Sequence, residues 1–225
     1  MAEASALLAE YRRRADDRAE PYFMSDAQVL ALLTEAEQEA CQRSHPIFDY
    51  NTDAVVEYAV VANQSSIALD PRVWRVDHAT FTPDGALRGC RIELTGIDAI
   101  RKLQDARGTV IASRPTHAAH SGRSTLTLYP APSVAGTLRL DVYRLPLYDI
   151  KSGSDKPEIP AELHMGLVDW VLYRVYDTPD MELTDPQRAQ RALADFTVRF
   201  GERRTGDAQR RHRERRRVTA GNVYP

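Results

Sequence analysis

The sequence contains little cysteine and has no long apolar run. Its 225 residues include two cysteines, Cys41 and Cys90, and they belong to no Cys-x-x-Cys pattern. A disulfide framework and a zinc ribbon are therefore not expected, which suits assembly in a reducing cytoplasm. No apolar run approaches the ~18 residues that crossing a bilayer requires, and the N-terminus lacks the order of a secretion signal. We expect no membrane partner.

Motifs for nucleotides, metals and catalysis are also absent. The sequence has no phosphate-binding glycine loop and no His-Glu-x-x-His motif. His117 and His120 are close in sequence but lack neighbouring acids or cysteines, and residues 112–124 around them have the weak pattern of a mobile loop. No base is identifiable for either cysteine. We therefore predict no cofactor, no metal site and no catalytic residue, so the chain is not expected to be an enzyme.

The balance of charge is uneven along the chain. Hydrophobic residues make up 43% of the sequence and the net charge is −2, which is typical of a globular protein and not of a generic nucleic-acid binder. Residues 199–217, however, hold nine arginines against three acids. This run is either a solvated helical end or a docking tail for an acidic protein surface or for DNA. No Phe, Tyr or Trp follows Phe200 in this run, so stacking on single-stranded bases is not expected.

The first 45 residues favour helices. Leu7, Leu8 and Tyr11 could share one face of a short helix that ends before Pro21. A stronger helix is predicted from Ser25, which with Gln28 forms a capping box, and apolar residues then recur at helical spacing.

The last third of the chain is also expected to be helical. A buried helix is predicted from Pro160, because proline suits the first helical position. A final helix is predicted from residues 184–187, where Thr184 and Gln187 are spaced as a second capping box. Asp169 and Trp170 lie on the first of these helices, and we interpret them as an exposed or subunit-facing carboxylate beside a core indole.

The middle of the chain alternates as strands do. Apolar and polar residues alternate over residues 90–95, 125–128 and 138–143, and turn residues separate these runs. A short helix is expected over residues 95–104. Alternation of apolar and polar residues is typical of an antiparallel sheet with one buried and one solvent-exposed face.

These patterns predict an α+β fold, in which a helical bundle from the N- and C-terminal segments carries an inserted antiparallel β region. The expected parts are N-terminal helices over residues 1–50, the β-rich region over 51–148, C-terminal helices over 149–202 and a basic extended tail over 203–225.

Three segments carry a resemblance to a known family. They are the leucine-plus-acid helix LLTEAEQEACQRS at 32–44, the strand pair around LYPAP at 124–147, and the closing helix pair that begins IPAELH at 159–196. In this order they resemble the phage head-to-tail adaptor proteins that join portal to tail. The resemblance implies a structural virion protein, assembled in the host cytoplasm, that forms a ring of usually twelve copies.

The same resemblance implies partners. The ring would dock on the portal protein, extend the DNA channel without sequence-specific DNA binding, and attach a tail or nozzle protein. We assign portal binding to the basic tail on its charge, with an apolar anchor at its tip. The predicted portal-binding residues are Arg203, Arg204, Arg210, Arg211, Arg213, Arg215, Arg216, Arg217, Val223 and Tyr224.

Other classes of protein fit part of this pattern. One is another connector ring protein, such as a head-completion or tail-terminator subunit. A second is a nucleic-acid-binding regulator with a basic tail, and a third is an enzyme whose site has no familiar motif. Steep salt dependence of binding to random duplex DNA would favour the regulator, and a pocket of perturbed acids and bases would favour the enzyme.

Overall fold

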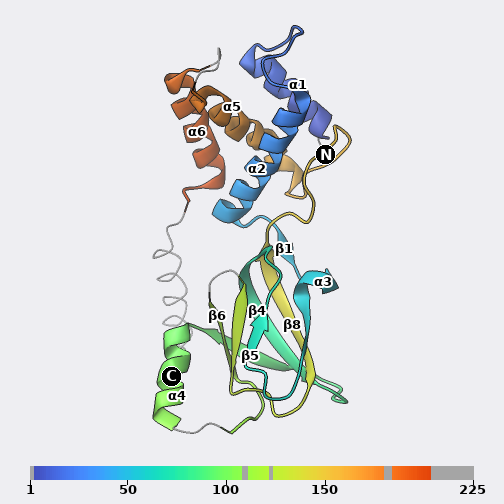
Figure 1. The fold of residues 1–225 in the computed structure, drawn as a ribbon, viewed down its shortest axis with the longest axis vertical. Helices are drawn as coiled ribbons and strands as arrows, with labels where there is room; N and C mark the ends of the chain where they lie inside the picture. The colour runs from blue at the N-terminus through green and yellow to red at the C-terminus, as the bar shows by residue number, and fades with distance from the viewer. Residues whose placement is uncertain (1–2, 108–110, 122–123, 180–183, 204–225) are drawn as a thin grey trace, which may run out of the picture. The chain divides into compact units, whose positions relative to one another are not determined.

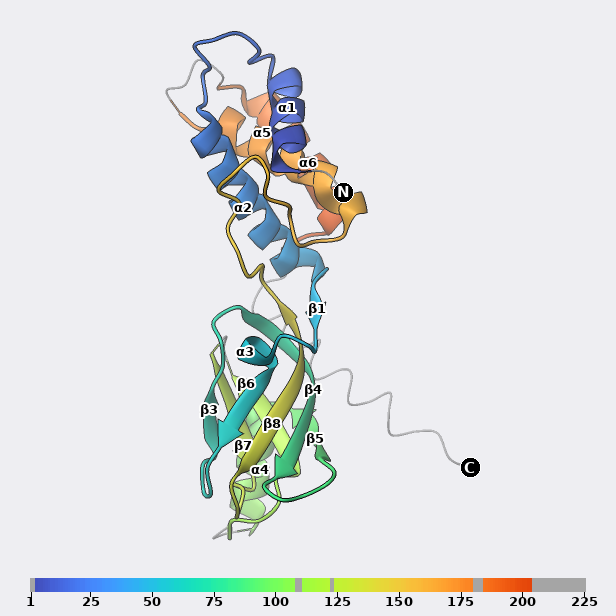
Figure 2. The same ribbon diagram turned by 90° about the vertical axis from the view of Figure 1, so that its right-hand side faces the viewer.

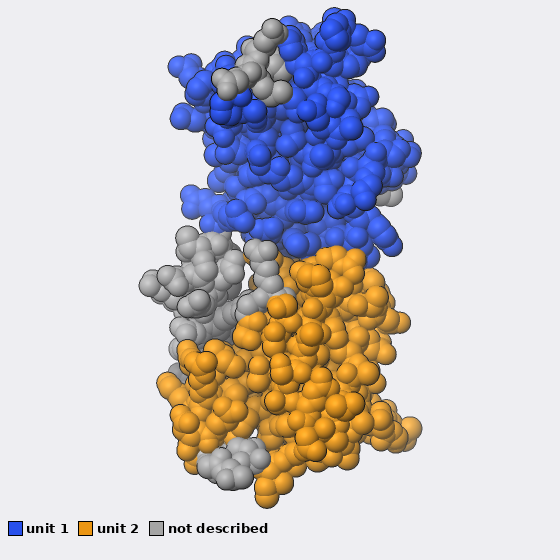
Figure 3. All heavy atoms as spheres, in the orientation of Figure 1, with its two compact units in different colours: residues 1–47, 145–203 blue, residues 48–144, 204–225 orange. Residues whose placement is uncertain are grey.

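The structure, a computed structural model, describes residues 3–107, 111–121, 124–179 and 184–203. Its helices and strands are drawn in Figure 1 and, turned by 90°, in Figure 2. The chain divides into two compact units (Figure 3). Unit 1 takes residues 1–47 and 145–203, and the described part of unit 2 takes residues 48–144.

Unit 1 is helical, and α5 is its central helix. Its elements are α1 (Ala4–Ala15), α2 (Asp26–Ser44), the 3-10 helix η1 (Ala161–Gly166), α5 (Leu167–Asp177) and α6 (Pro186–Phe200). Because α5 packs against α1, α2 and α6, residues from both ends of the sequence share one core (Figure 2). None of the helices in the described part of the chain combines the length and apolar character that crossing a bilayer demands.

The beginning of α2 agrees with the sequence prediction. The Ser25 hydroxyl accepts a hydrogen bond from the Gln28 N–H at 3.3 Å, and the Gln28 side-chain oxygen accepts one from the Ser25 N–H at 2.9 Å. The predicted capping box is confirmed.

The other two predicted helix starts need correction. The side chain of Asp185, not Thr184, caps α6, and the Thr184 hydroxyl donates instead to the Thr178 carbonyl at 2.7 Å. Asp185 directly precedes Pro186, and its carboxylate accepts the free N–H groups of Gln187 at 3.0 Å and Arg188 at 3.1 Å. Pro160 precedes the 3-10 turn η1, and the α-helix proper begins only at Leu167.

Unit 2 is built on one eight-stranded sheet. Its elements are β1 (Phe48–Asp49), α3 (Asp53–Val56), β2 (Glu57–Val60), β3 (Ser66–Ala68), β4 (Val73–Pro83), β5 (Cys90–Thr95), α4 (Ile97–Arg107), β6 (His117–Ser121), β7 (Thr125–Tyr129) and β8 (Gly136–Arg144). The order across the sheet is β1-β8-β4-β5-β6-β7-β3, and β2 also pairs with β8.

The fold-class prediction, a helical bundle with an inserted antiparallel β region, is wrong. The sheet is large and mixed, because β5 and β6 pair in parallel from Glu93↔His117 to Thr95↔Ala119. Parallel neighbours need a crossover connection, and α4 supplies it. The β region is therefore a mixed α/β unit with its own helices, not a minor antiparallel insertion into a bundle.

The predicted mobile loop at residues 112–124 is also wrong, because it contains β6. The segment HAAHS has no period-two pattern to reveal a strand. Ala118 and Ala119 are both fully buried, and Ala119 forms a small core with Ile100 of α4 and Tyr129 of β7. The Tyr129 hydroxyl donates to the Leu103 carbonyl at 3.1 Å and so fastens the end of α4 to the sheet.

A buried ion pair joins the two ends of the unit 2 segment. Arg144 Nε lies 2.5 Å from Asp49 Oδ2, and both side chains are less than a tenth exposed. Burial alone would raise the Asp49 pKa, but Arg144 and the N–H groups of Thr52 and Asn51 outweigh it and hold that pKa well below its ordinary value. The same carboxylate therefore orders the turn into α3 and pairs β1 with the last residue of β8.

Candidate functional site

The first residue of the predicted basic tail lies in the described part of the chain. Arg203 follows α6, and its Nη2 donates to Gln42 Oε1 at 3.0 Å while its Nη1 lies 3.8 Å from Glu39 Oε2. The Arg203 side chain is 60% exposed, whereas Glu39 is 8% exposed. Arg203 thus bridges the chain that leaves α6 to the last turns of α2.

Arg43 strengthens the same junction. Its Nε lies 2.8 Å from Glu39 Oε1, and its Nη1 donates to Thr197 Oγ1 at 3.1 Å and to the Gly201 carbonyl at 3.2 Å. The C-terminal carbonyls of a helix lack partners within the helix, so Arg43 satisfies a group that α6 leaves open. We call residues 39, 42, 43, 197, 201 and 203 the arginine root.

Two aromatic rings pack against Arg43 of the arginine root. The Arg43 guanidinium lies 5.4 Å from the centroid of Trp170 and 5.1 Å from that of Phe196, and these two rings lie 5.0 Å apart. A guanidinium over an aromatic face gains from the ring quadrupole, more so when it is desolvated. Trp170 is buried, as predicted for a core indole. These contacts hold the chain in place where it enters the basic tail, residues 203–225, which is called the basic segment below.

The rest of the predicted site is not placed by the structure. The other predicted portal-binding residues all lie outside the described residues: Arg204, Arg210, Arg211, Arg213, Arg215, Arg216, Arg217, Val223 and Tyr224. The structure brings none of them together, and their role stays a prediction.

Asp169 lies in a charged cavity of unit 1. A cavity of about 510 Å³ is lined by Glu10, Arg14, Met165, Asp169, Asp195, Val198 and Arg199. Burial raises the Asp169 pKa, and the Arg14 guanidinium, 2.7 Å away, opposes that rise. Asp169 is not exposed, because only 4% of the residue is accessible and it pairs with Arg14, whereas its facing a subunit stays a prediction.

The lining of the cavity is mostly charged. Its lining holds acids and arginines but no cysteine, serine or histidine that a nearby base might activate. Among the described residues, no three His, Cys, Asp or Glu side chains gather closely enough to hold a metal ion. His117 instead approaches Glu93 of the neighbouring strand at 3.7 Å. Within the cavity lining, Arg14 and Asp169 form an ion pair.

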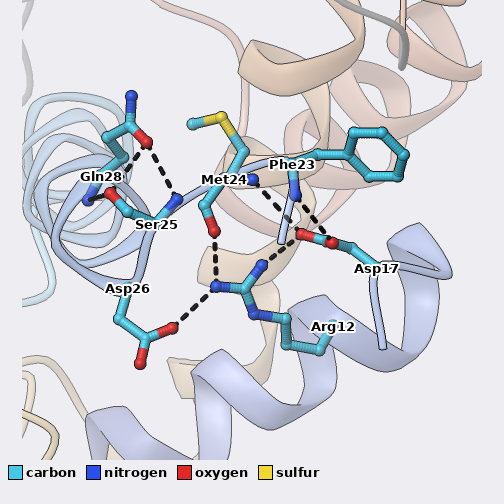
Figure 4. Close-up of polar contacts among 7 residues, drawn as sticks. All are labelled: Arg12, Asp17, Phe23, Met24, Ser25, Asp26 and Gln28. Carbon is cyan, nitrogen blue, oxygen red and sulfur yellow. Dashed lines mark hydrogen bonds and ion pairs between the residues drawn. The ribbon is translucent and has the colours of Figure 1, made fainter. Parts of the chain in front are cut away.

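A second polar network, which the sequence patterns did not reveal, shapes the connection between α1 and α2 (Figure 4). The Arg12 guanidinium pairs with Asp17 and donates to the Met24 carbonyl at 2.6 Å and to Asp26 at 2.7 Å. Asp17 in turn accepts the N–H of Phe23 at 3.0 Å. The network folds the connection into an ordered turn in which Phe23 stays 48% exposed.

Several features of the described residues indicate the general class of the protein. Two folded units, a basic segment leaving a braced helix end and exposed apolar side chains on ordered loops are typical of a structural protein that binds other proteins. The family model described as SU10 adaptor protein matches residues 2–221. The chain belongs to this family of phage head-to-tail adaptor proteins. No curated protein matches the sequence.

Proposed function

We propose that the protein forms a ring in the virion of a tailed phage, docks on the portal, extends the channel for DNA and provides the attachment site for the tail. Twelve copies are the number that the resemblance implies. Membership of the adaptor family over residues 2–221 carries this proposal. It favours a structural role over an enzymatic one, and the absence of catalysis stays a prediction.

The basic segment is proposed to bind the portal. The arginine root supports this, because Glu39 and Gln42 hold Arg203, so the basic segment begins at a fixed point of unit 1. Arginine forks pair with carboxylates in two parallel hydrogen bonds, so an acidic portal surface is a suitable partner. DNA is a poorer one, because a channel through which DNA slides should not hold it with many arginines per subunit.

The decisive variant neutralises the segment without shortening it. Replacing Arg210, Arg211, Arg213, Arg215, Arg216 and Arg217 with glutamine should lower co-sedimentation with purified portal rings at least about tenfold, since contacts repeated around a ring are lost together. A matched control, R18Q with R101Q, neutralises two arginines that are more than 60% exposed elsewhere and should bind as the wild type does. Replacing the same six arginines with lysine keeps the charge but removes the planar guanidinium. This variant therefore separates the effect of charge from that of paired hydrogen bonds.

Two other results would overturn this assignment. Undiminished portal binding after truncation behind Gly201 would mean that the segment is a solvated end and that unit 1 makes the joint. Undiminished portal binding by the glutamine variant, together with loss of a steeply salt-dependent affinity for random duplex DNA, would make DNA the partner.

Assembly is proposed to depend on the portal. We expect the isolated protein to be monomeric or weakly associated, because a closed ring spreads modest contacts over many copies and a template brings them together. Light scattering tests this directly. A stable small dimer without affinity for portal rings would contradict the proposal and would favour another connector protein or a regulator.

A further inference from the structure

One end of the unit 2 sheet gathers several loops. Gly136, the first residue of β8, pairs with Val60 at the end of β2 and with Pro83 at the end of β4. The loops that follow β2 and β4 and the loop that precedes β8 therefore lie at the same end. Residues 48 and 144, where the chain enters and leaves the unit, lie at the other end, since Phe48 pairs with Tyr143.

Backbone hydrogen bonds tie these loops together. The Asn63 N–H donates to the Pro132 carbonyl at 2.7 Å, and the Asp84 N–H donates to the Ala135 carbonyl at 3.0 Å. A further segment joins them through Ser113, whose N–H donates to the Ala131 carbonyl at 2.9 Å. We call residues 61–65, 84–89, 111–115 and 130–135 the distal loop surface. Its backbone is ordered by the sheet and by these bonds.

Each of the four loops exposes a large aliphatic side chain. The exposed fractions are 63% for Val61, 102% for Leu87, 83% for Ile111 and 51% for Val134. Leu87 lies on the β4–β5 hairpin, which projects from the sheet in Figure 1. Single exposed apolar residues are ordinary, but loops usually carry polar ones, and apolar side chains on four joined loops are typical of a contact surface.

The surroundings of these side chains suit a protein partner. Asp84, Arg88 and Arg114 are exposed on the same loops as the aliphatic side chains and provide both signs of charge. An apolar centre with a polar rim is the usual composition of a protein interface. The mixed charges give nucleic acid no continuous basic track.

The apolar area of the four aliphatic side chains can be compared with that of a typical protein interface. Each aliphatic side chain offers roughly 100 Å² of apolar surface, so the four offer at most on the order of 400 Å². A stable pairwise complex buries about 800 Å² on each partner. About 57% of such an interface is non-polar, so the four side chains could supply most of the apolar part of one contact, and repeated around a ring they suit a partner with as many matching sites.

We propose that the distal loop surface is the docking site for a multi-copy protein on the tail side of the particle, one that offers apolar pockets to Leu87 and its neighbours. This inference rests on the proposed adaptor function and deepens it. The basic segment, which continues from unit 1, is assigned there to the portal. The apolar surface of unit 2 is chemically distinct and is left for the other neighbour.

The test is complementation of a phage that lacks its own adaptor gene. The variant L87S/V134S removes two exposed apolar side chains, and L87S alone serves if the double variant does not fold. The control Y148S removes a side chain that is 77% exposed in unit 1. DNA-filled heads are purified, probed for adaptor with antibody, and scored for tails by electron microscopy.

The expected result distinguishes attachment of the adaptor to the head from attachment of the tail to the adaptor. Wild type and Y148S should give heads with adaptor and tails, and L87S/V134S should give heads with adaptor but about tenfold fewer tails. Undiminished tails would overturn the inference and leave the proposed function intact. Loss of the variant adaptor from heads would also overturn it, because the surface would then serve the portal or the ring. Absence of the wild-type adaptor from heads would refute the proposed function, and the inference with it.

Discussion

Replacing Asp49 with asparagine should destabilise unit 2 strongly. The change keeps the size of the side chain but removes the charge that pairs with Arg144 at 2.5 Å. Arg144 is only 9% exposed, so its guanidinium would stay buried after losing the carboxylate that its Nε contacts. Breaking one side of a buried ion pair costs about 3–5 kcal/mol, because the remaining charge keeps its desolvation penalty.

Each unit contains one of the two tryptophans, so the loss of stability can be measured for unit 2 alone. Trp74 lies in β4 of unit 2 and Trp170 in α5 of unit 1. In a W170F background, Trp74 fluorescence therefore reports the unfolding of unit 2 alone. We expect D49N to lower the free energy of unfolding by about 3 kcal/mol and the melting midpoint by roughly 10–20 °C, as is usual for about 100 residues.

The matched control is D53N. Asp53 lies 3.4 Å from Arg139, but its side chain is 74% exposed, so its loss should change the stability by no more than about 0.5 kcal/mol. A D49N protein as stable as D53N would refute the claim that the buried pair holds the two ends of unit 2 together.

The pH dependence of the same pair has a definite sign. The Asp49 pKa is depressed in the folded state, so its contribution is complete well above its ordinary value of 3.8 and is lost as the pH falls below it. The stability of the wild type should therefore approach that of D49N in strong acid. A difference that grew on acidification would contradict this linkage.

Three further substitutions test other parts of the fold. F196A should cost unit 1 about 3–5 kcal/mol, since Phe196 is fully buried, and denaturation followed by Trp fluorescence measures this. D17N weakens a charge-assisted bond worth about 1.5–3 kcal/mol, so amide exchange at Phe23 should accelerate about tenfold or more. G136A should lose more than about 2 kcal/mol of unit 2 stability, because a Cβ there would collide with the Thr82 carbonyl oxygen.

Local patterns predicted the helices of unit 1 well. The capping box at Ser25 depends on residues three apart, and the apolar stripe that includes Leu33 and Ala36 depends on residues within two turns. Such features are encoded in contiguous sequence. Phe196 and Phe200, four residues apart in α6, are both buried. The sequence therefore predicted α2 and α6, the two helices that carry the arginine root, but not their contact.

The sheet was predicted less well, because its architecture depends on pairing between distant segments. The alternation at Ile92 and at Leu140 revealed the strands but not whether their neighbours run parallel. Strand β6 escaped because two alanines, both buried, interrupt any alternation. Arg203 was predicted from charge alone, whereas its partners Glu39 and Gln42 lie some 160 residues away, and no local pattern connects them.

The insertion of unit 2 between residues 47 and 145 has a consequence for synthesis on the ribosome. Helices α1 and α2 emerge first but cannot bury their faces until α5 and α6 are made. Unit 2 emerges complete before then, and its folding brings Phe48 opposite Tyr143. That pairing replaces a loop of about 100 residues, whose closure costs roughly 3 kcal/mol more than that of a few residues, by a short bridge. Folding of the sheet thus assists folding of the helical unit: a nascent chain that has emerged from the ribosome only as far as residue 160 should already hold a folded unit 2, while its first two helices still lack their partners.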